Sequence, residues 1–303
     1  MKKFFIYTFI IGFLLFFYLN RIEITNFTLK KIANYMSKDD DIISEYVTNH
    51  NFFTIKKMDS LYVSSINDIY NAIYTIIDNG WNNKYLFCDL KYYDCINDLN
   101  NLTGNDVYIE FVNNIVHPYN SFNNIKIITY ELGFAKIEIV KNYTDNEIVN
   151  INKEIKNIEK KIIKSNMGIK DKIKVFHDYV IDNTKYDVEE SIILEKNPYA
   201  DVTSNKASKV LFDNIGLCGG YTDTLAIYLH TLGLGNYKIS SNSHIWNYTI
   251  INIIGYHIDM TWDDPVISTG EEIIDDTYLL ITTDELYELD NITHDFDKIL
   301  YNA

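Results

Sequence analysis

The sequence predicts an α+β protein in which a small α+β unit precedes a second unit that carries the candidate chemistry. Apolar residues recur at helical spacing in several long segments, for example in 145–162. Residues 125–130 and 134–140 instead alternate, as two strands flanking a turn do. Hydrophobic residues make up 47% of the 303 residues and charged residues 23%, a composition that allows a packed core. We place the boundary between the two units at residues 144 and 145.

The first twenty residues form an apolar segment. Lys2 and Lys3 precede an uncharged run from Phe4 to Leu19, and Arg21 follows it. At about 1.5 Å per residue this run spans roughly 24 Å, less than a hydrocarbon core of about 30 Å. The positive start is typical of a secretory signal, but no small-residue cleavage site follows. We therefore expect residues 1–20 to be a signal peptide or an uncleaved membrane anchor, with a buried core helix as the alternative. Export is favoured, which places the protein outside the cell or at its surface.

The charge balance and the residue spacing exclude several classes of partner. The formal net charge of −15 leaves few cations to neutralise phosphates, so we do not expect a nucleic-acid partner. A structural zinc site needs a second cysteine pair or clustered histidines, and the sequence offers neither. The acidic runs also lack the spacing of a calcium-binding loop. No cofactor is therefore expected.

The unit predicted at residues 21–144 shows secondary structure but no candidate chemistry. Residues 21 to about 60 are expected to form a stalk or an irregular helix. The segments that follow are predicted as a helix at 61–77 ended by Asn79-Gly80, a strand at 85–88, a helix at 93–102, and strands at 125–130 and 134–140.

Two of the three cysteines lie close together in this first unit. Cys88 and Cys95 could close a small disulfide loop in an oxidising compartment, or they could be two reduced thiols. Both alternatives stay open at the level of sequence. If the two residues pair, Cys218 is the unpaired cysteine of an exported protein.

The second unit begins with two predicted helices. The stretch Thr144-Asp-Asn-Glu147 has capping-box spacing and opens a helix with an isoleucine stripe. A second helix is predicted at 170–181. His177 on that helix is interpreted as a surface histidine or as one whose hydrogen bonds are satisfied.

Cys218 lies in the glycine turn Gly216-Leu-Cys-Gly-Gly-Tyr221, directly before a predicted helix that ends near Gly233. Free backbone N–H groups and the helix dipole stabilise a thiolate at such a position, and the same groups can donate to an oxyanion. The alternative is an inert cysteine that packs the turn. This segment by itself does not decide between the two interpretations.

Two predicted strands downstream supply a histidine and a carboxylate. In strand 243–251 His244 shares a face with Trp246, and in strand 255–262 Asp259 shares a face with His257. An antiparallel pairing with a turn around residues 251 and 252 sets His244 opposite Asp259. A histidine oriented by a carboxylate is what a cysteine nucleophile requires. The alternatives are a core histidine and a strand-end carboxylate.

The chain resembles the bacterial transglutaminase-like superfamily in three ordered motifs, Gly216-Leu-Cys-Gly-Gly-Tyr, His244-Ile-Trp-Asn and Tyr256-His-Ile-Asp-Met-Thr-Trp-Asp-Asp-Pro265. The resemblance runs from about residue 171 to 296 and includes Thr184-Lys-Tyr-Asp187. It implies a papain-like α+β core at 145–303, with the cysteine on a helix that packs against an antiparallel sheet. It also implies that Cys218 is the nucleophile, His244 the general base and Asp259 the residue that orients His244.

The sequence departs from this pattern at one position. Papain-type enzymes place a glutamine about six residues before the cysteine to complete the oxyanion hole, and Phe212 stands there in this chain. Asn214 or a backbone amide is the substitute to consider. The stretch Trp262-Asp-Asp-Pro265 belongs to the family pattern and is interpreted as structural, with Pro265 ending the strand.

The expected function is that of an exported thiol enzyme. It acts on amide or peptide bonds of a protein or peptide, including cell-wall peptide, by acyl transfer or hydrolysis through a thioester. A peptidase or amidase is the favoured outcome. The alternative is an inactive transglutaminase-like module that binds or scaffolds at the cell surface.

Overall fold

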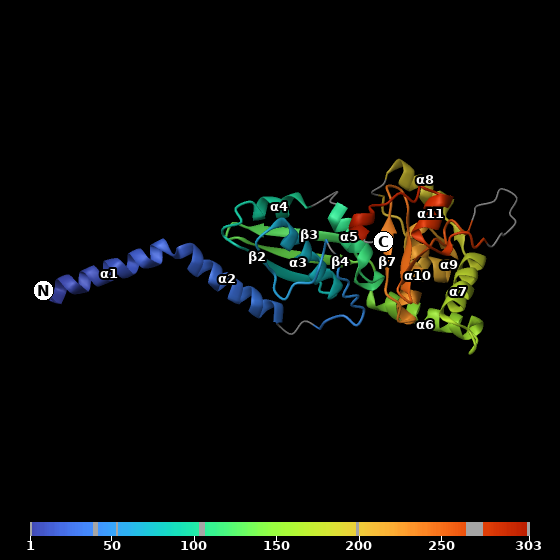
Figure 1. Ribbon diagram of the computed structural model, residues 1–303, viewed down its shortest axis with the longest axis horizontal. Helices are drawn as coiled ribbons and strands as arrows, with labels where there is room; N and C mark the ends of the chain where they lie inside the picture. Colours follow the sequence, from blue (N-terminus) through green and yellow to red (C-terminus); the bar gives the residue numbers. More distant parts are fainter. Residues whose placement is uncertain are drawn as a thin grey trace.

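The computed structural model describes residues 2–38, 42–52, 54–102, 107–197, 200–264 and 275–301, and it has the α+β architecture that the sequence predicts (Figure 1). The helices are α1 (Lys2–Leu19), α2 (Arg21–Lys38), α3 (Ile66–Asp78), α4 (Cys95–Asn101), α5 (Val107–Ile115), α6 (Asp145–Ile162), α7 (Ile169–Asn183), α8 (Val188–Lys196), α9 (Ala207–Asp213), α10 (Cys218–Thr231), α11 (Thr283–Leu289) and α12 (Lys298–Tyr301), with a 3₁₀ turn η1 at Pro118–Asn120. The strands are β1 (Tyr62–Val63), β2 (Asn83–Cys88), β3 (Phe122–Tyr130), β4 (Phe134–Lys141), β5 (Lys185–Tyr186), β6 (Ile215–Gly216), β7 (Asn236–Ser240), β8 (Ile245–Ile251), β9 (Ile254–Ile258) and β10 (Leu279–Ile281).

The described strands form two four-stranded sheets and one two-stranded sheet. The first sheet has the order β1-β2-β4-β3, in which only the β1–β2 pair is parallel. The second sheet, β10-β9-β8-β7, is antiparallel throughout. Strands β5 and β6 pair in parallel beside α10.

Helix α3 begins later than the periodicity predicts. Ser65 adopts an extended conformation, and its side chain accepts a hydrogen bond from the backbone N–H of Asp68. A serine that caps in this way satisfies one of the free N–H groups of the first turn. Tyr62 and Val63, which the sequence assigns to the helix, instead pair with β2.

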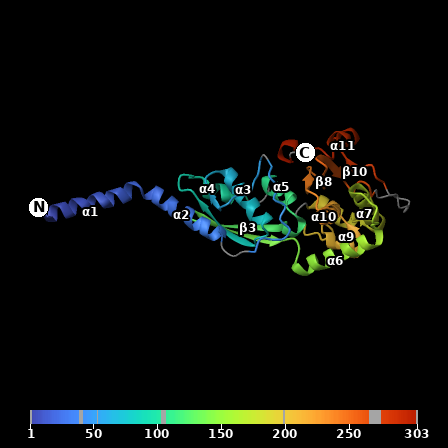
Figure 2. The same ribbon diagram turned by 60° about the horizontal axis from the view of Figure 1, so that its bottom comes forward.

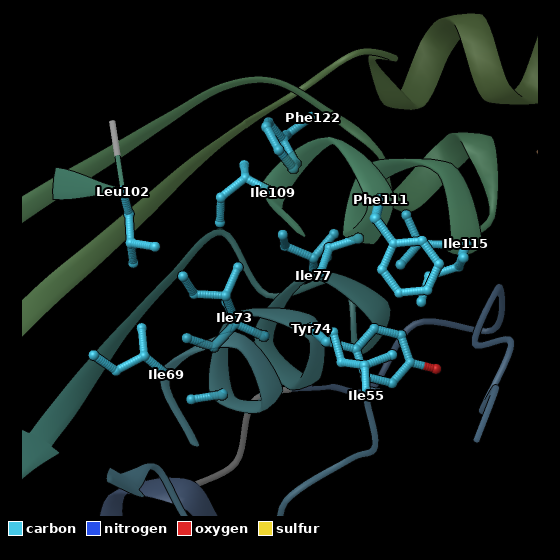
Figure 3. Packing of buried hydrophobic residues seen from close by; sticks show 14 of the residues in the cluster. Ile55, Ile69, Ile73, Tyr74, Ile77, Leu102, Ile109, Phe111, Ile115 and Phe122 are labelled. Carbon is cyan, nitrogen blue, oxygen red and sulfur yellow. The ribbon is translucent and has the colours of Figure 1, made fainter. Parts of the chain in front are cut away.

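The core of the first unit lies between α3, α5 and the first sheet (Figure 3). Ile69, Ile73 and Ile77 of α3 face Ile109 and Ile115 of α5 and are almost fully buried. The same buried cluster continues into the second unit through three aromatic side chains, Tyr237, Trp246 and Tyr301. The core of the first unit therefore extends into the second unit, where α6, α7 and α10 enclose a second buried cluster. The boundary placed at residues 144 and 145 falls at the N-cap of α6, and it stays a prediction.

Residues 21–38 form a regular helix rather than a stalk or an irregular one. The Asn26 side chain donates to Asp89 Oδ1 at 2.7 Å and accepts from the backbone N–H of Leu90 at 2.8 Å. Asn26 and Ala33 are buried. These contacts attach α2 to the edge of the first sheet, where the segment after β2 begins.

Helix α1 lies apart from the rest of the chain in both ribbon views (Figures 1 and 2). Its apolar side chains are exposed on every side, with Phe9 74% and Leu19 69% exposed. Over the part of the chain that the structure describes, no single helix has both the length and the apolar composition to cross a membrane. The pair 5–19 and 21–36, which is bent by 62°, meets those criteria of length and composition when the two helices are taken together.

Cys88 and Cys95 form a disulfide, so the first of the two alternatives holds. Both residues are buried, and the bond ties Cys88 at the end of β2 to Cys95 at the start of α4. Cys218 is the free cysteine of the described chain.

The second unit begins with the predicted capping box. The Thr144 side chain accepts from the backbone N–H of Glu147, and the Glu147 side chain accepts from the backbone N–H of Thr144. In the α7–α10 contact, the rings of Phe176 and Tyr228 stack with their centres 3.8 Å apart. Helix α10 also packs against β7 and β8, so the helix that begins at Cys218 lies against the antiparallel sheet (Figure 1).

The predicted pairing of the two strands is wrong by two residues. Tyr248 pairs with His257 and Ile251 with Ile254, so the turn consists of Asn252 and Ile253. Both turn residues have positive φ, at 50° and 66°. An isoleucine is rarely found in that conformation, which explains why the sequence gives no signal for this turn. Because side chains alternate with a period of two, a shift by two residues keeps every side chain on its predicted face.

Candidate active site

Cys218 is the first residue of α10. The preceding residue, Leu217, is the N-cap, and its carbonyl accepts from the N–H groups of Gly220 at 2.9 Å and Tyr221 at 3.1 Å. The N–H groups of Cys218 and Gly219 come earlier in the turn, where no helical carbonyl precedes them. The half-buried Cys218 side chain therefore lies at the positive end of a helix dipole.

The upstream Thr184–Asp187 motif supports this turn. The Asp187 side chain accepts from Ser204 Oγ at 2.5 Å, and the Ser204 carbonyl accepts from the backbone N–H of Leu217 at 2.9 Å. A Cβ on Gly220 would lie 2.4 Å from the same Ser204 carbonyl oxygen. Only glycine fits at this position, because the backbone of the 204 segment passes directly over the first turn of α10.

Two hydrogen bonds fix the N-terminal turn of α10 against β8. Thr222 Oγ1 donates to the Ile245 carbonyl at 3.0 Å, and Asn247 Nδ2 donates to the Thr222 carbonyl at 2.9 Å. Because Ile245 is the first residue of β8, these bonds place Cys218 beside the residue before the strand, which is His244.

The structure brings all three predicted residues together, but His244 and Asp259 lie at strand ends rather than within strands. His244 directly precedes β8 and Asp259 directly follows β9. His244 Nε2 and Asp259 Oδ2 are 2.5 Å apart. The other oxygen, Asp259 Oδ1, accepts from the backbone N–H groups of Thr261 at 3.0 Å and Trp262 at 3.3 Å. The turn after β9 thus orients the carboxylate toward the histidine.

The electrostatics of the pair favour the ion-pair form. Burial lowers the pKa of the His244 imidazole, but the Asp259 carboxylate and the hydrogen-bonding contact with Cys218 together raise that pKa to about 10. Burial raises the pKa of Asp259, but His244 and a second histidine, His294, hold it well below its usual range. At neutral pH a protonated His244 therefore lies between the Cys218 sulfur and an ionised Asp259. Because Nε2 contacts Asp259, Nδ1 is the ring nitrogen that remains for Cys218.

The sequence analysis missed His294. Its Nε2 lies 2.9 Å from Asp259 Oδ2, and its Nδ1 lies 3.0 Å from Asp290 Oδ2. The side chain is fully buried. The available signal was the spacing of four residues between Asp290 and His294, but a single carboxylate–histidine pair in a loop does not by itself indicate a site.

His244, Asp259 and His294 could hold a metal ion by proximity, because one ligand atom from each lies within 4.8 Å of the others. The same atoms are already joined by the two hydrogen bonds of 2.5 and 2.9 Å to Asp259 Oδ2. A metal would have to displace the protons of both contacts. In this structure the three side chains form a hydrogen-bonded cluster around Asp259 Oδ2.

The Trp262–Pro265 stretch has a structural role over the part that is described. Asp263 is buried; its Oδ2 accepts from His177 Nε2 at 3.0 Å and its Oδ1 from the Tyr278 backbone at 2.9 Å. Tyr221 of α10 donates to Asp264. His177 is thus a buried and satisfied histidine, and its alternative placement on the surface is wrong. Pro265 lies outside the described residues.

The oxyanion position lacks the expected side-chain donor. Phe212 lies in α9, is 46% exposed and has no polar group to donate. Asn214 adopts a left-handed conformation with φ 57° and caps α9. The backbone N–H of Cys218, in the first turn of α10, is a donor without an intrahelical partner. Tyr186 also lies within electrostatic reach, since burial and then Cys218 raise the pKa of its hydroxyl.

No model of a known protein family matches the chain, and no curated protein matches it. Among the solved structures that match the chain, two are similar to half of it. A crystal structure of a TGase is 20% identical, with a TM-score of 0.34, and the match covers 50% of this chain and 46% of that one. A candidate cysteine protease from Cytophaga hutchinsonii is 10% identical, with a TM-score of 0.29, and the match covers 50% of this chain and 65% of that one. The chain thus spans less than two thirds of either protein.

Proposed function

We propose that the protein is an exported, transglutaminase-like thiol enzyme that attacks amide carbonyls through Cys218. One observation carries the proposal: His244 lies between the Cys218 sulfur and the Asp259 carboxylate at the N-terminus of a buried helix. A thiolate next to an imidazolium and a helix N-terminus is the arrangement that activates a cysteine nucleophile.

The first chemical step forms a thioester. The Cys218 thiolate attacks the carbonyl carbon of a carboxamide or peptide, and the developing oxyanion is met by the backbone N–H of Cys218. The C–N bond then breaks, and protonated His244 gives its proton to the leaving amine. Asp259 stabilises the imidazolium before this transfer and holds the ring in place throughout.

The second step determines the reaction class. Water or an amine gives a proton to neutral His244 and attacks the thioester, which releases the Cys218 thiolate. Water yields hydrolysis, as in a peptidase or amidase, and an amine yields acyl transfer. We favour hydrolysis of a protein or peptide substrate, including cell-wall peptide.

Export is the second part of the proposal. The apolar α1 would direct the chain to the membrane, either as a signal peptide or as an anchor. The Cys88–Cys95 disulfide supports an oxidising compartment, because such bonds persist outside the cytosol. Cell fractionation of the full chain and of a variant without residues 1–20 tests this part. Equal cytosolic recovery of both forms would contradict it.

The pH dependence of Cys218 alkylation tests the catalytic part. Cys88 and Cys95 are bonded to each other, so iodoacetamide reports on Cys218 alone in the non-reduced protein. We expect an inflection in the alkylation rate below about pH 7.5, and we expect His244→Ala to remove it. A rate that follows an ordinary thiol with a pKa of about 8.5 would count against catalysis.

A second assay separates hydrolysis from transfer. The chain is incubated with a glutamine-containing protein and a labelled amine, with Cys218→Ala as the control. Peptide cleavage or ammonia release without label incorporation supports hydrolysis, and incorporation that the control lacks supports transfer.

The presence of Phe212, where papain-type enzymes have a glutamine that completes the oxyanion hole, favours one alternative function. Without a glutamine at that position the site could be an inactive relic in a cell-surface binding module. This alternative predicts unreactive Cys218 and no product in either assay.

A further inference from the structure

We propose that the side-chain amide of Asn205 is the second oxyanion donor of this site, beside the backbone N–H of Cys218. This inference rests on the proposed function of Cys218 and deepens it, because it assigns a catalytic residue that lies outside all of the sequence motifs. It also accounts for Phe212: a donor that reaches the first turn of α10 from another segment replaces the missing glutamine.

The Asn205 side chain lies against the first turn of α10. A Cβ built on Gly219, the residue after the nucleophile, would lie 2.7 Å from Asn205 Oδ1, 3.1 Å from its Cγ and 3.2 Å from its Cβ. The absence of a side chain at Gly219 therefore leaves room for the amide. The terminal amide of an asparagine turns about the Cβ–Cγ bond between two broad orientations, so Nδ2 can take the place of Oδ1 over this turn. Asn205 and Cys218 are both partly exposed, so a substrate carbonyl can approach them.

Three hydrogen bonds hold the backbone directly before Asn205. Ser204 is 2% exposed, its N–H donates to Glu190 Oε2 at 2.7 Å, and its Oγ donates to Asp187 Oδ2 at 2.5 Å. The Ser204 carbonyl accepts from the Leu217 N–H at 2.9 Å, which joins this segment to the N-cap of α10. The segment that carries the amide is thus fixed to the helix that carries the nucleophile. A donor on such a support needs little reorganisation to meet an oxyanion.

The acylation step gives both donors their role. The Cys218 thiolate forms a C–S bond with the carbonyl carbon of the amide, and the π electrons of the carbonyl move to its oxygen. The N–H of Cys218 and Nδ2 of Asn205 each donate a hydrogen bond to this oxyanion. The C=O bond then re-forms as the C–N bond breaks, and the leaving nitrogen takes the proton of His244. The two donors therefore act on a charge that exists only after the attack.

Two other polar side chains belong to segments next to the nucleophile. Asn214 is exposed, adopts a left-handed conformation and caps α9. Tyr186 pairs with Gly216 in the β5–β6 ladder, and burial and then Cys218 raise the pKa of its hydroxyl. Asn205 differs from both in lying directly on the turn whose free N–H groups face a substrate oxygen.

The test compares two reactions of the same thiolate. Acylation by p-nitrophenyl acetate passes through a tetrahedral oxyanion, whereas alkylation by iodoacetamide is a displacement at a saturated carbon and forms none. The readout is the ratio of the two rates, with Cys218→Ala subtracted as the background. Asn205→Ala should lower this ratio by about 10²-fold through slower acylation and leave the pH profile of alkylation in place. A merely structural role would instead change both rates together.

Gly219→Ala is the second variant, because its methyl group takes the space of the Asn205 amide without removing a donor. It should lower the ratio as well. Asn214→Gly is the matched control, since it removes an amide near the nucleophile and still permits the left-handed backbone. Tyr186→Phe removes the hydroxyl that lies within electrostatic reach of the sulfur. Both of these variants should keep the ratio of the wild type, and circular dichroism reports the folding of each.

The outcomes distinguish this inference from the proposed function. A wild type whose alkylation lacks a low-pH inflection overturns the proposed function, and the role of Asn205 with it. Where the inflection is present, an unchanged ratio in Asn205→Ala, or in Gly219→Ala if only that variant folds, overturns the role of Asn205 alone. A loss of the same size in Asn214→Gly or Tyr186→Phe also overturns it, because the effect would then not be specific to Asn205.

Discussion

At the scale of single residues, Asp259 makes the hydrogen bonds that connect the parts of the site. Its two oxygens receive two imidazoles and two backbone N–H groups, so every contact direction of the carboxylate is used. Such a buried anion is stable only while its donors are present. Changes at Asp259 should therefore affect the chemistry of His244 and the stability of the fold together.

Asp259→Asn tests this directly. The amide removes the charge that raises the pKa of His244, so we expect the low-pH inflection of Cys218 alkylation to disappear and turnover to fall by about 10²–10⁴-fold. Asp263→Asn is the matched control, since Asp263 is an equally buried carboxylate bonded to His177. The control should lose stability but keep the inflection. Equal loss of the inflection in both variants would contradict the assignment.

The raised pKa of His244 also predicts a dependence of stability on pH. The pKa is about 10 in the folded protein, against about 6.5 for a free histidine. Protonated His244 therefore stabilises the fold fully below about pH 6.5, and this contribution is lost as the pH rises through about 10. Urea unfolding of the wild type and of His244→Gln should give a difference in unfolding free energy that shrinks by a few kcal/mol across this range. A difference that grows with pH would show that the sign is wrong.

At the scale of elements, the site depends on how α10 begins. The glycines of the Cys218 turn are not equivalent. A Cβ on Gly220 would meet the backbone oxygen of Ser204 at 2.4 Å, whereas the atom nearest to a Cβ on Gly219 is the Asn205 side-chain oxygen at 2.7 Å, the more movable of the two. The backbone contact also lies in the network that joins Asp187 to Leu217. The start of the helix is thus fixed by a segment of chain that precedes α9.

Gly220→Ala is expected to destabilise the protein by about 1–3 kcal/mol and to reduce the reactivity of Cys218, because the 204 segment must move. Gly219→Ala in the same turn should cost less than 1 kcal/mol, or stabilise the helix slightly. Thermal unfolding with parallel iodoacetamide rates checks both effects. The explanation fails if the two alanine variants have the same stability.

The strands show which part of an element a sequence can predict. Alternation predicts which face each residue within β8 and β9 takes, because a side chain's face depends only on its position in a period of two, but His244 and Asp259 lie just outside these strands. The register was not predictable, because the turn contains Ile253 in a conformation that its side chain disfavours. The pairing of β8 with β7 and β9, which forces that turn, forms only in the folded sheet.

At the scale of the whole molecule, the first unit is part of the support for the second. Asn114 of α5 donates to Ser240 Oγ and to Tyr301 Oη, each at 2.9 Å. The rings of Phe111 and Tyr301 meet edge to face at 5.1 Å. Helix α5 therefore covers β7 and the C-terminal helix α12, which belong to the unit that holds Cys218; Figure 1 shows α5 beside β7 and the C-terminus.

A chain of residues 145–303 is therefore expected to lack a fixed tertiary structure. It would expose the apolar surface around Tyr237, Ile239 and Tyr301 that α5 and its neighbours cover. We expect weak near-ultraviolet circular dichroism, strong binding of a hydrophobic dye and no cooperative unfolding, against normal behaviour of the full chain. A cooperative transition of the fragment would instead support independent domains on either side of residue 145.

The sequence by itself determined the α+β class, the capping box of α6, the helical position of Cys218 and the proximity of His244 to Asp259. These features depend on local periodicity and on short motifs, which need no knowledge of distant contacts. Only the tertiary structure decided that the core of the first unit extends into the second, that the strands pair two residues away from the predicted register, and that Asp259 contacts two histidines. Each of these depends on contacts between segments far apart in the chain. The contact between His294 and Asp259 requires the loop after α11 to pack against the end of β9, and no local sequence pattern predicts that packing.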